Sequence, residues 1–117
     1  MHVDILSATA TQCRAFMKNC AQKWKEKCIL ACTESVEFCM TVLEYAFETL
    51  KLSDRISKVG NKMLQSDFKI CKYYSYASVQ AAIVNVEINL NSLSDEKYID
   101  EIVKKYKKIL EKAKKIS

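Results

Sequence analysis

Three polar side chains in the second half of the chain combine residue types suited to proton transfer with a spacing that a helix would organise. Asp67 follows Ser66, and Asn85 and Asn89 lie four residues apart in a mostly apolar run. That spacing places both amides on one helix face, together with small residues that a flat ligand could approach. A carboxylate can exchange a proton, and amides can hydrogen-bond a ligand edge. The structural alternative makes Asp67 a helix-dipole partner and the amides contacts between helices.

The residue types of well-known catalytic centres are otherwise missing from the sequence. It contains no Ser-His-Asp set, no phosphate-binding loop and no cluster with metal-ligand spacing, so no metal is expected. The one histidine, His2, could act as a base, but its place beside the terminus favours a frayed residue without a function. Composition by itself therefore indicates a helical bundle without a recognisable active site.

The six cysteines, at positions 13, 20, 28, 32, 39 and 71, first suggest a set of disulfides. No C-x-x-C is present, and the recurrent spacings of four and seven place cysteines on a helix stripe. We expect reduced, buried thiols that pack as small hydrophobic side chains, with disulfides or a metal site as the alternatives. Because no secretory leader and no run of about 18 apolar residues is found, we expect a cytoplasmic protein that does not span a membrane.

The composition predicts an all-α fold. With no proline, one glycine and 50% hydrophobic residues, the 117-residue chain favours long helices and short turns. We expect a single domain over residues 1–117, an antiparallel bundle of three to four long helices. Residues 1–103 carry 12 basic and 13 acidic side chains, whereas the rest carries seven lysines and one glutamate. The lysines form a solvated face or dock an anionic partner, and nucleic-acid binding is not expected.

Apolar spacing predicts the helix positions. Residues 7–32 have an irregular stripe, so they either break near residues 19–23 or continue into a helix over residues 33–59. The inward stripe of that second segment is regular and is expected to extend further through Leu52, Ile56 and Val59. Its members are Val36, Cys39, Met40, Leu43, Ala46, Phe47 and Leu50.

Turn and cap residues predict where the later helices begin and end. Gly60 is expected to close the preceding helix in the left-handed conformation, with Asn61 in the turn. Ser66 is the predicted N-cap of a central helix that ends at about Leu90, and Ser94 is the predicted N-cap of the last helix. Residues 77–90 are apolar on nearly all sides, so we expect them to be buried among several neighbours.

The order of several short motifs resembles one protein family. They are A-C-T-E-S-V from Ala31, G-N at Gly60, S-D at Ser66, A-A-I-V-N-V-E-I-N-L from Ala81 and S-D-E-K-Y from Ser94. This order resembles the C-terminal part of the cyclodeaminase domain of formiminotransferase-cyclodeaminase and the related methenyltetrahydrofolate cyclohydrolase-like proteins. The resemblance covers about residues 26–117.

The resemblance implies a dimeric all-α domain that binds a tetrahydrofolate derivative as substrate. It further implies cyclodeaminase or methenyltetrahydrofolate cyclohydrolase activity in folate one-carbon metabolism. In that case Asp67 is the candidate acid/base, and Asn61, Asn85 and Asn89 are the candidate substrate-binding residues. The amides suit the edges of a pterin ring, and lysines suit the carboxylates of the folate tail.

The chain also departs from the family pattern. The family domain is longer and begins with helices that carry a P-G-G-G turn, which has no counterpart in this sequence. The alternative function is therefore a catalytically inactive helical module that oligomerises through an exposed apolar face. A third interpretation is an unrelated bundle in which the motif order is coincidental. The sequence does not decide between these functions, nor which folate form is used.

Overall fold

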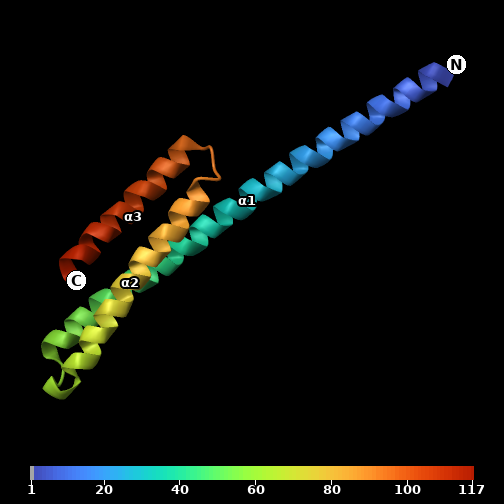
Figure 1. Ribbon diagram of the computed structural model, residues 1–117. Helices are drawn as coiled ribbons and strands as arrows, with labels where there is room; N and C mark the ends of the chain where they lie inside the picture. The colour runs from blue at the N-terminus through green and yellow to red at the C-terminus, as the bar shows by residue number, and fades with distance from the viewer. Residues whose placement is uncertain (1) are drawn as a thin grey trace. The chain divides into compact units, whose positions relative to one another are not determined.

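The computed structural model describes the backbone of residues 2–117 and the side chains of residues 9–117. The elements are α1 (His2–Val59), the short 3-10 helix η1 (Lys62–Leu64), α2 (Gln65–Leu90) and α3 (Glu96–Ile116) (Figure 1). No strand occurs in this part of the chain, and the all-α prediction is confirmed. The chain divides within α1 into two units, Met1–Ala31 and Cys32–Ser117, which are described separately.

The unit Met1–Ala31 consists of the first part of α1. All of its described side chains, from residue 9 onward, are exposed, including Phe16, Met17 and Trp24. The helix continues through residues 19–23, so the alternative of a break there is wrong. Neither proline nor glycine occurs at these positions, and nothing else in the local sequence forces a helix to end. The side chain of His2 lies outside the described residues.

The unit Cys32–Ser117 is a bundle made of the rest of α1, α2 and α3. Near the η1 turn, Lys72 Nζ lies 3.0 Å from Asp54 Oδ1, which joins α2 to α1. At the other end, Tyr98 Oη lies 2.6 Å from Glu37 Oε1, which joins the start of α3 to α1. Consecutive helices therefore run antiparallel, as predicted (Figure 1).

Aliphatic side chains from the three helices form the core of this unit. Val36, Leu43, Leu50, Val79 and Val86 are fully buried. Burial of each such side chain stabilises the fold by about 1.5–3 kcal/mol. The last helix contributes one apolar face to this core, made of buried or partly buried residues: Tyr98, Ile99, Ile102, Val103, Tyr106, Ile109, Leu110, Ala113 and Ile116.

The inward stripe of α1 is confirmed as far as Leu50, but its predicted extension is wrong. Leu52, Ile56 and Val59 are exposed, whereas Ser53 is buried. The 3.6-residue period brings position 53 back to the core, one turn after Leu50. Positions 52, 56 and 59 instead lie on the outer face of the helix.

The central helix α2 is covered on one side, and the prediction that several neighbours surround it is wrong. Its buried residues are Ser75, Val79, Ala82, Ile83, Val86 and Leu90. Val84 and Ile88, between these positions, are 53% and 60% exposed. Within the unit Cys32–Ser117, the other helices cover the inner side alone, and the apolar residues of the outer side are exposed.

Gly60 follows α1 without adopting the left-handed conformation, and that prediction is wrong. Its amide donates to Ile56 O at 2.7 Å. A Cβ at this position would lie 2.6 Å from Phe68 Cε2 and 2.7 Å from Ile56 O. Glycine is therefore needed here because a side chain has no room between the end of α1 and the start of α2.

Two of the predicted caps differ from the observed ones. Ser66 lies inside α2, which begins at Gln65 without a side-chain cap. Asp95 rather than Ser94 caps α3, since its carboxylate accepts a hydrogen bond from Tyr98 N at 3.2 Å. Each observed cap is one or two residues from the predicted position, and at α3 this is because the neighbouring Asp95 binds the orphan amide in place of Ser94.

All six cysteines are free, as predicted, but the prediction that they are buried is wrong. Cys32 and Cys39 are partly buried, and the other four are exposed. Cys13, Cys20 and Cys28 belong to the first unit, in which every described side chain is exposed. Among the described residues, no helix is long and apolar enough to cross a membrane.

Candidate functional site

The end of the bundle where α1 turns into α2 holds two of the predicted site residues. Asn61 precedes η1, and its Oδ1 accepts a hydrogen bond from Met63 N at 3.0 Å. Its backbone carbonyl accepts from Leu64 N at 3.0 Å. The side-chain oxygen of Asn61 therefore helps to form the turn, and the residue as a whole is exposed.

Asp67 lies in the first turn of α2 and is exposed. A carboxylate at this position interacts favourably with the positive end of the helix dipole, which is the structural alternative for this residue. A groove of about 420 Å³ at the same turn is lined by Ser57, Gln65, Ser66, Lys69 and Lys72, and Asp67 is not among its lining residues. The groove contains two ammonium groups together with hydroxyl and amide groups, and no ion pair is found for Lys69 among the described residues, which suits an anionic ligand.

An ion network fixes one wall of this groove. The Asp54 carboxylate bridges Lys72, at 3.0 Å, and Lys58, at 3.2 Å. Hydrogen bonds from Lys72 and then from Lys58 lower the pKa of Asp54. The nearby Gln65 Nε2 donates to Ser57 O at 3.0 Å and ties the start of α2 to α1. These contacts hold the turn, and none of them was predicted from the sequence.

Asn85 and Asn89 lie at the opposite end of α2. Asn85 is exposed, and Asn89 is partly buried. Asn89 Nδ2 donates to Asn85 O at 2.9 Å, so this amide pairs with the backbone of its own helix. The prediction that the amides lie in a buried helix is therefore wrong for Asn85, and the structural alternative of a contact between helices is not seen for Asn89, whose amide bonds its own helix.

The two groups of predicted site residues are far apart within one chain. Asp67 and Asn85 are separated by 18 residues of continuous helix, a distance of about 27 Å at a rise of 1.5 Å per residue. Asn61 precedes the helix and Asn89 lies another turn further on. A single pterin ring therefore cannot contact both groups in one chain.

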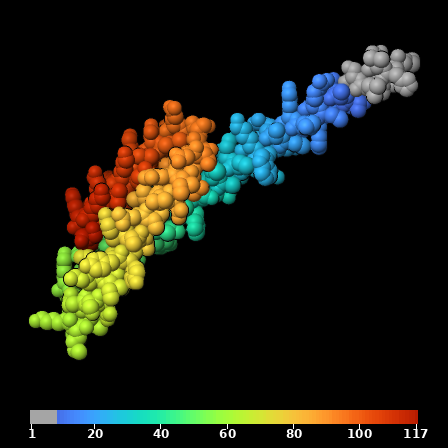
Figure 2. Space-filling model, in the orientation of Figure 1, coloured from blue at the N-terminus to red at the C-terminus, as the bar shows by residue number. Residues whose placement is uncertain are grey.

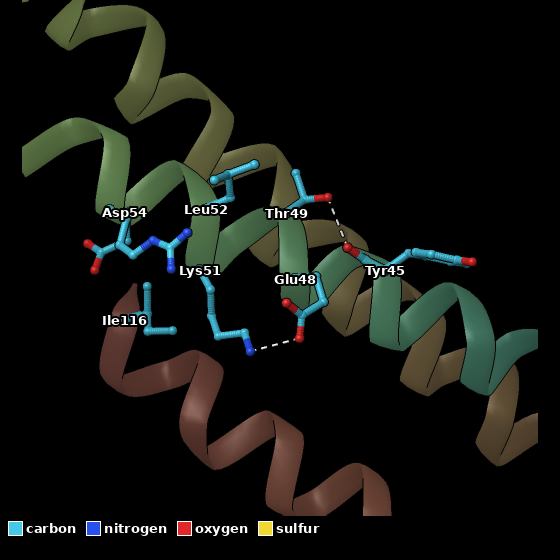
Figure 3. Close-up of a pocket in the computed structure, with 8 residues that line it drawn as sticks. Tyr45, Glu48, Thr49, Lys51, Leu52, Asp54 and Ile116 are labelled. Carbon is cyan, nitrogen blue, oxygen red and sulfur yellow. Dashed lines mark hydrogen bonds and ion pairs between the residues drawn. The ribbon is translucent and has the colours of Figure 1, made fainter. Parts of the chain in front are cut away.

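Two further grooves are lined by residues that were not predicted. One of about 480 Å³ lies between α1 and the end of α3 (Figure 3). In it, Lys51 pairs with Glu48 at 2.7 Å and Thr49 bonds Tyr45 O, while Ile116 forms the opposite wall. These charges are already paired within one helix, so the groove presents no convergent set of polar groups.

The other groove, of about 460 Å³, lies where α2 meets α3 and includes Glu87, Asn91 and Tyr106. Burial, followed by the neighbouring Glu87 carboxylate, raises the pKa of Tyr106. Tyr106 therefore stays protonated at neutral pH. This groove is close in sequence to Asn89, but neither Asn85 nor Asn89 lines it.

Comparison with protein families decides the kinship of the chain. The model of the family described as formiminotransferase-cyclodeaminase matches residues 9–108. The chain belongs to this family. The match spans 100 of the 117 residues and includes both groups of predicted site residues. No curated protein and no solved structure matches the chain.

Membership of the formiminotransferase-cyclodeaminase family places the chain in folate one-carbon metabolism. The match confirms the resemblance on which the site residues were chosen, although both asparagines are more exposed than predicted. The roles of Asn61, Asp67, Asn85 and Asn89 remain predictions. Of the residues that sequence reasoning missed, Asp54 and Lys58 had a detectable signal, the spacing of an intrahelical ion pair. Lys72 had none, because its contact with Asp54 depends on the packing of two helices.

Proposed function

We propose that this chain acts on a tetrahydrofolate derivative, as a cyclodeaminase or a methenyltetrahydrofolate cyclohydrolase. The observation that carries the proposal is the family match, which extends across the turn that holds both Asp67 and a groove with two lysines. The anionic glutamate tail of a folate suits Lys69 and Lys72, and Asn61 and Asp67, at the same end of α2, are the candidates for contacts with the pterin. Carboxylate recognition by exposed lysines adds modest affinity and fixes orientation.

In the cyclodeaminase reaction, N10 of the folate attacks the formimino carbon, the new ring closes and ammonia leaves. Asp67 takes the proton released from N10 and returns it to the departing nitrogen, so the carboxylate is unchanged after one turnover. The Asn61 amide donates a hydrogen bond to the pterin edge. In the cyclohydrolase reaction, the same carboxylate takes a proton from the water that attacks the methenyl carbon and passes it to the ring nitrogen whose bond to that carbon breaks. The hydroxyl proton of the intermediate is released to solvent as the formyl group forms.

The 27 Å separation along α2 gives Asn85 and Asn89 a different place in this proposal. They contact the folate bound at the Asp67 end of a second subunit, so the complete site needs an oligomer. This requirement follows from the length of the helix between the two groups. A monomeric chain is then expected to bind folate weakly and to turn over slowly.

The test measures loss of the near-ultraviolet band of 5,10-methenyltetrahydrofolate when the chain is added. Asp67→Asn should lower kcat by about 100-fold or more, the usual contribution of a positioned acid/base. The matched control is Asp100→Asn, an exposed aspartate on α3 that should leave kcat unchanged. Equal kcat values for Asp67→Asn and the wild-type chain would remove Asp67 from the mechanism.

A second test separates binding from turnover. Lys69→Gln should weaken folate binding about two- to fivefold, as measured by calorimetry, because an exposed ion pair is worth roughly 0.5–1 kcal/mol. Lys105→Gln, an exposed lysine on α3, is the control. An unchanged dissociation constant in Lys69→Gln would exclude this groove as the tail site.

A second candidate function is a catalytically inactive module that works through protein contacts. It is favoured by the exposure of Asp67 and Asn85 together with the exposed apolar residues on the outer side of α2. Under this proposal the wild-type chain neither binds a folate nor consumes methenyltetrahydrofolate. Turnover by the oligomeric chain would exclude this candidate.

A further inference from the structure

The outer face of α2 differs sharply from the solvent-facing side of α3. Of the twelve exposed residues in α3, all are charged. Of the twelve exposed residues in α2 between positions 70 and 88, Glu87 alone is charged. Protein interfaces are depleted in charge and enriched in aromatic residues, and this face also carries Tyr73 and Tyr74. In Figure 2, α2 (yellow to orange) forms a continuous strip of surface along the unit Cys32–Ser117.

The apolar residues on this face follow the spacing of a helix–helix seam. They recur at alternating intervals of four and three, which is the heptad pattern of a coiled coil. The stripe, here called the outer stripe, consists of Ile70, Tyr74, Ala77, Ala81, Val84 and Ile88. All six are exposed, and they lie opposite the α2 residues that face the core.

Exposed apolar residues of α1 have a similar spacing, but many charged residues lie around them. Phe38, Val42, Tyr45 and Leu52 are exposed along its outer side. Seven of the sixteen exposed residues between positions 32 and 59 of α1 are charged, however. Charges at that density are typical of a solvated helix face. The α2 stripe is therefore the stronger docking surface.

The outer stripe is symmetric about residue 79. Positions 70 and 88, 74 and 84, and 77 and 81 each lie at equal distances from that centre. Isoleucines occupy the two ends and alanines the two central positions. A helix with this pattern is complementary to an antiparallel copy of itself, because every position then meets its symmetric counterpart across a two-fold axis.

We propose that the outer stripe is the interface of a homodimer in which two copies of α2 pack antiparallel about residue 79. Ile70 contacts Ile88 of the partner subunit, Tyr74 contacts the partner's Val84, and Ala77 contacts the partner's Ala81. The central alanines allow the two helices to approach closely, and the larger side chains fill the space on either side. The proposal specifies the face and the register, and it does not depend on folate chemistry.

The residues that flank the outer stripe fit the same register. In an antiparallel pair with these core layers, Cys71 lies beside the partner's Asn85, and Tyr73 lies beside the partner's Glu87. The tyrosine hydroxyl can donate a hydrogen bond to that carboxylate, and neither flank brings like charges together. Glu87, the single acidic residue of the face, thus meets a hydrogen-bond donor across the interface rather than a second carboxylate.

This dimer brings together the two separated groups of site residues. Asp67 near the start of one α2 lies level with the last turn of the partner's α2, which contains the partner's Asn89. The composite site rests on the proposed function, whereas the dimer does not. A dimer that binds no folate would contradict the proposed function and leave the interface intact.

Solution mass measured by light scattering tests the interface. The wild-type chain should have the mass of two chains, and Ala81→Glu should weaken the dimer by more than about 100-fold, because a charge would be buried without a partner. Ser35→Glu adds the same charge at an exposed position on α1 and should remain dimeric. Circular dichroism should show equal helix content in all three. A monomeric wild-type chain, or a dimeric Ala81→Glu, would overturn the proposal.

A thiol cross-link tests the register. Asn85→Cys places a thiol beside the native Cys71 of the other chain, and a short bis-maleimide should join them. Within one chain these positions are 14 residues apart, or about 21 Å along α2, which is too far for such a reagent. Mass spectrometry should find the 71–85 linked peptides, and these should disappear when Cys71 is also replaced by serine. A cross-link between Cys71 of one chain and Cys71 of the other would show parallel packing. Absence of any cross-link at residue 85 would exclude this face. Either outcome would contradict the proposal.

Discussion

Tyr98 donates a hydrogen bond from its hydroxyl to Glu37 Oε1 at 2.6 Å, and this contact joins residues 61 positions apart. It connects the first turn of α3 to α1. Desolvation and then the hydrogen bond to the Glu37 carboxylate raise the pKa of Tyr98 to about 12. The contact fixes the register of α3 along α1 at the end remote from the η1 turn.

Removal of this hydroxyl should destabilise the bundle. Tyr98→Phe is expected to lower the free energy of unfolding by about 1–2 kcal/mol, the usual range for a hydrogen bond to a charged group. Urea denaturation followed by circular dichroism measures the change. Glu37→Gln and the double variant complete a mutant cycle, in which additive losses would show that the two side chains do not interact.

The same contact predicts a dependence on alkaline pH. The pKa of Tyr98 in the folded chain, about 12, lies above its usual value of 10.0. Its contribution is therefore complete below pH 10 and is lost as the pH rises through about 12. Denaturation midpoints measured across that interval should fall more steeply in the wild-type chain than in Tyr98→Phe. Parallel curves for the two proteins would contradict this assignment.

The Asp54 network predicts the opposite dependence, at acid pH. Hydrogen bonds from Lys72 and Lys58 hold the pKa of Asp54 below the usual value of 3.8. The stabilisation is present above that value and is lost as the pH falls through the lowered pKa of the folded state. Asp54→Asn should therefore reduce the loss of stability between about pH 5 and about pH 2. Thermal unfolding of both proteins across this range tests the expectation, and Asp100→Asn is the control.

Two leucines of α1 should respond differently to the same substitution. Leu43 is fully buried and Leu52 is 49% exposed. Leu43→Ala should lower the free energy of unfolding by about 2–5 kcal/mol through lost burial and a residual cavity. Leu52→Ala should cost well under half as much, and urea titrations of the two variants give the comparison. Similar losses would show that the outer side of α1 is also packed.

Gly60 should not tolerate a side chain. Gly60→Ala places a methyl group against the Phe68 ring and the Ile56 carbonyl oxygen, and it should cost about 1–3 kcal/mol through a shift of the η1 turn. The control is Ser92→Ala, in the exposed link before α3, which should change stability by less than about 0.5 kcal/mol. A neutral Gly60→Ala would show that the start of α2 moves freely relative to α1.

The sequence by itself determined the helices, the main core stripes and the family. Without proline, and with one glycine, the chain has few of the turn residues that connect strands, and the periodic spacing of residues such as Leu43 and Leu50 identified an inward face. The motif order around Asn85 and Asp95 identified the family because it does not depend on packing.

Only the tertiary structure decided which apolar face of α2 is covered. Residues 77–90 are apolar on opposite sides, and a periodic pattern cannot distinguish a side that meets α1 and α3 from a side that meets nothing in the described chain. The same limit applies to Asp54 and Lys72, whose contact requires two helices to meet at one height. Local sequence sets the local conformation, whereas burial and the distance between Asp67 and Asn85 depend on how complete helices pack.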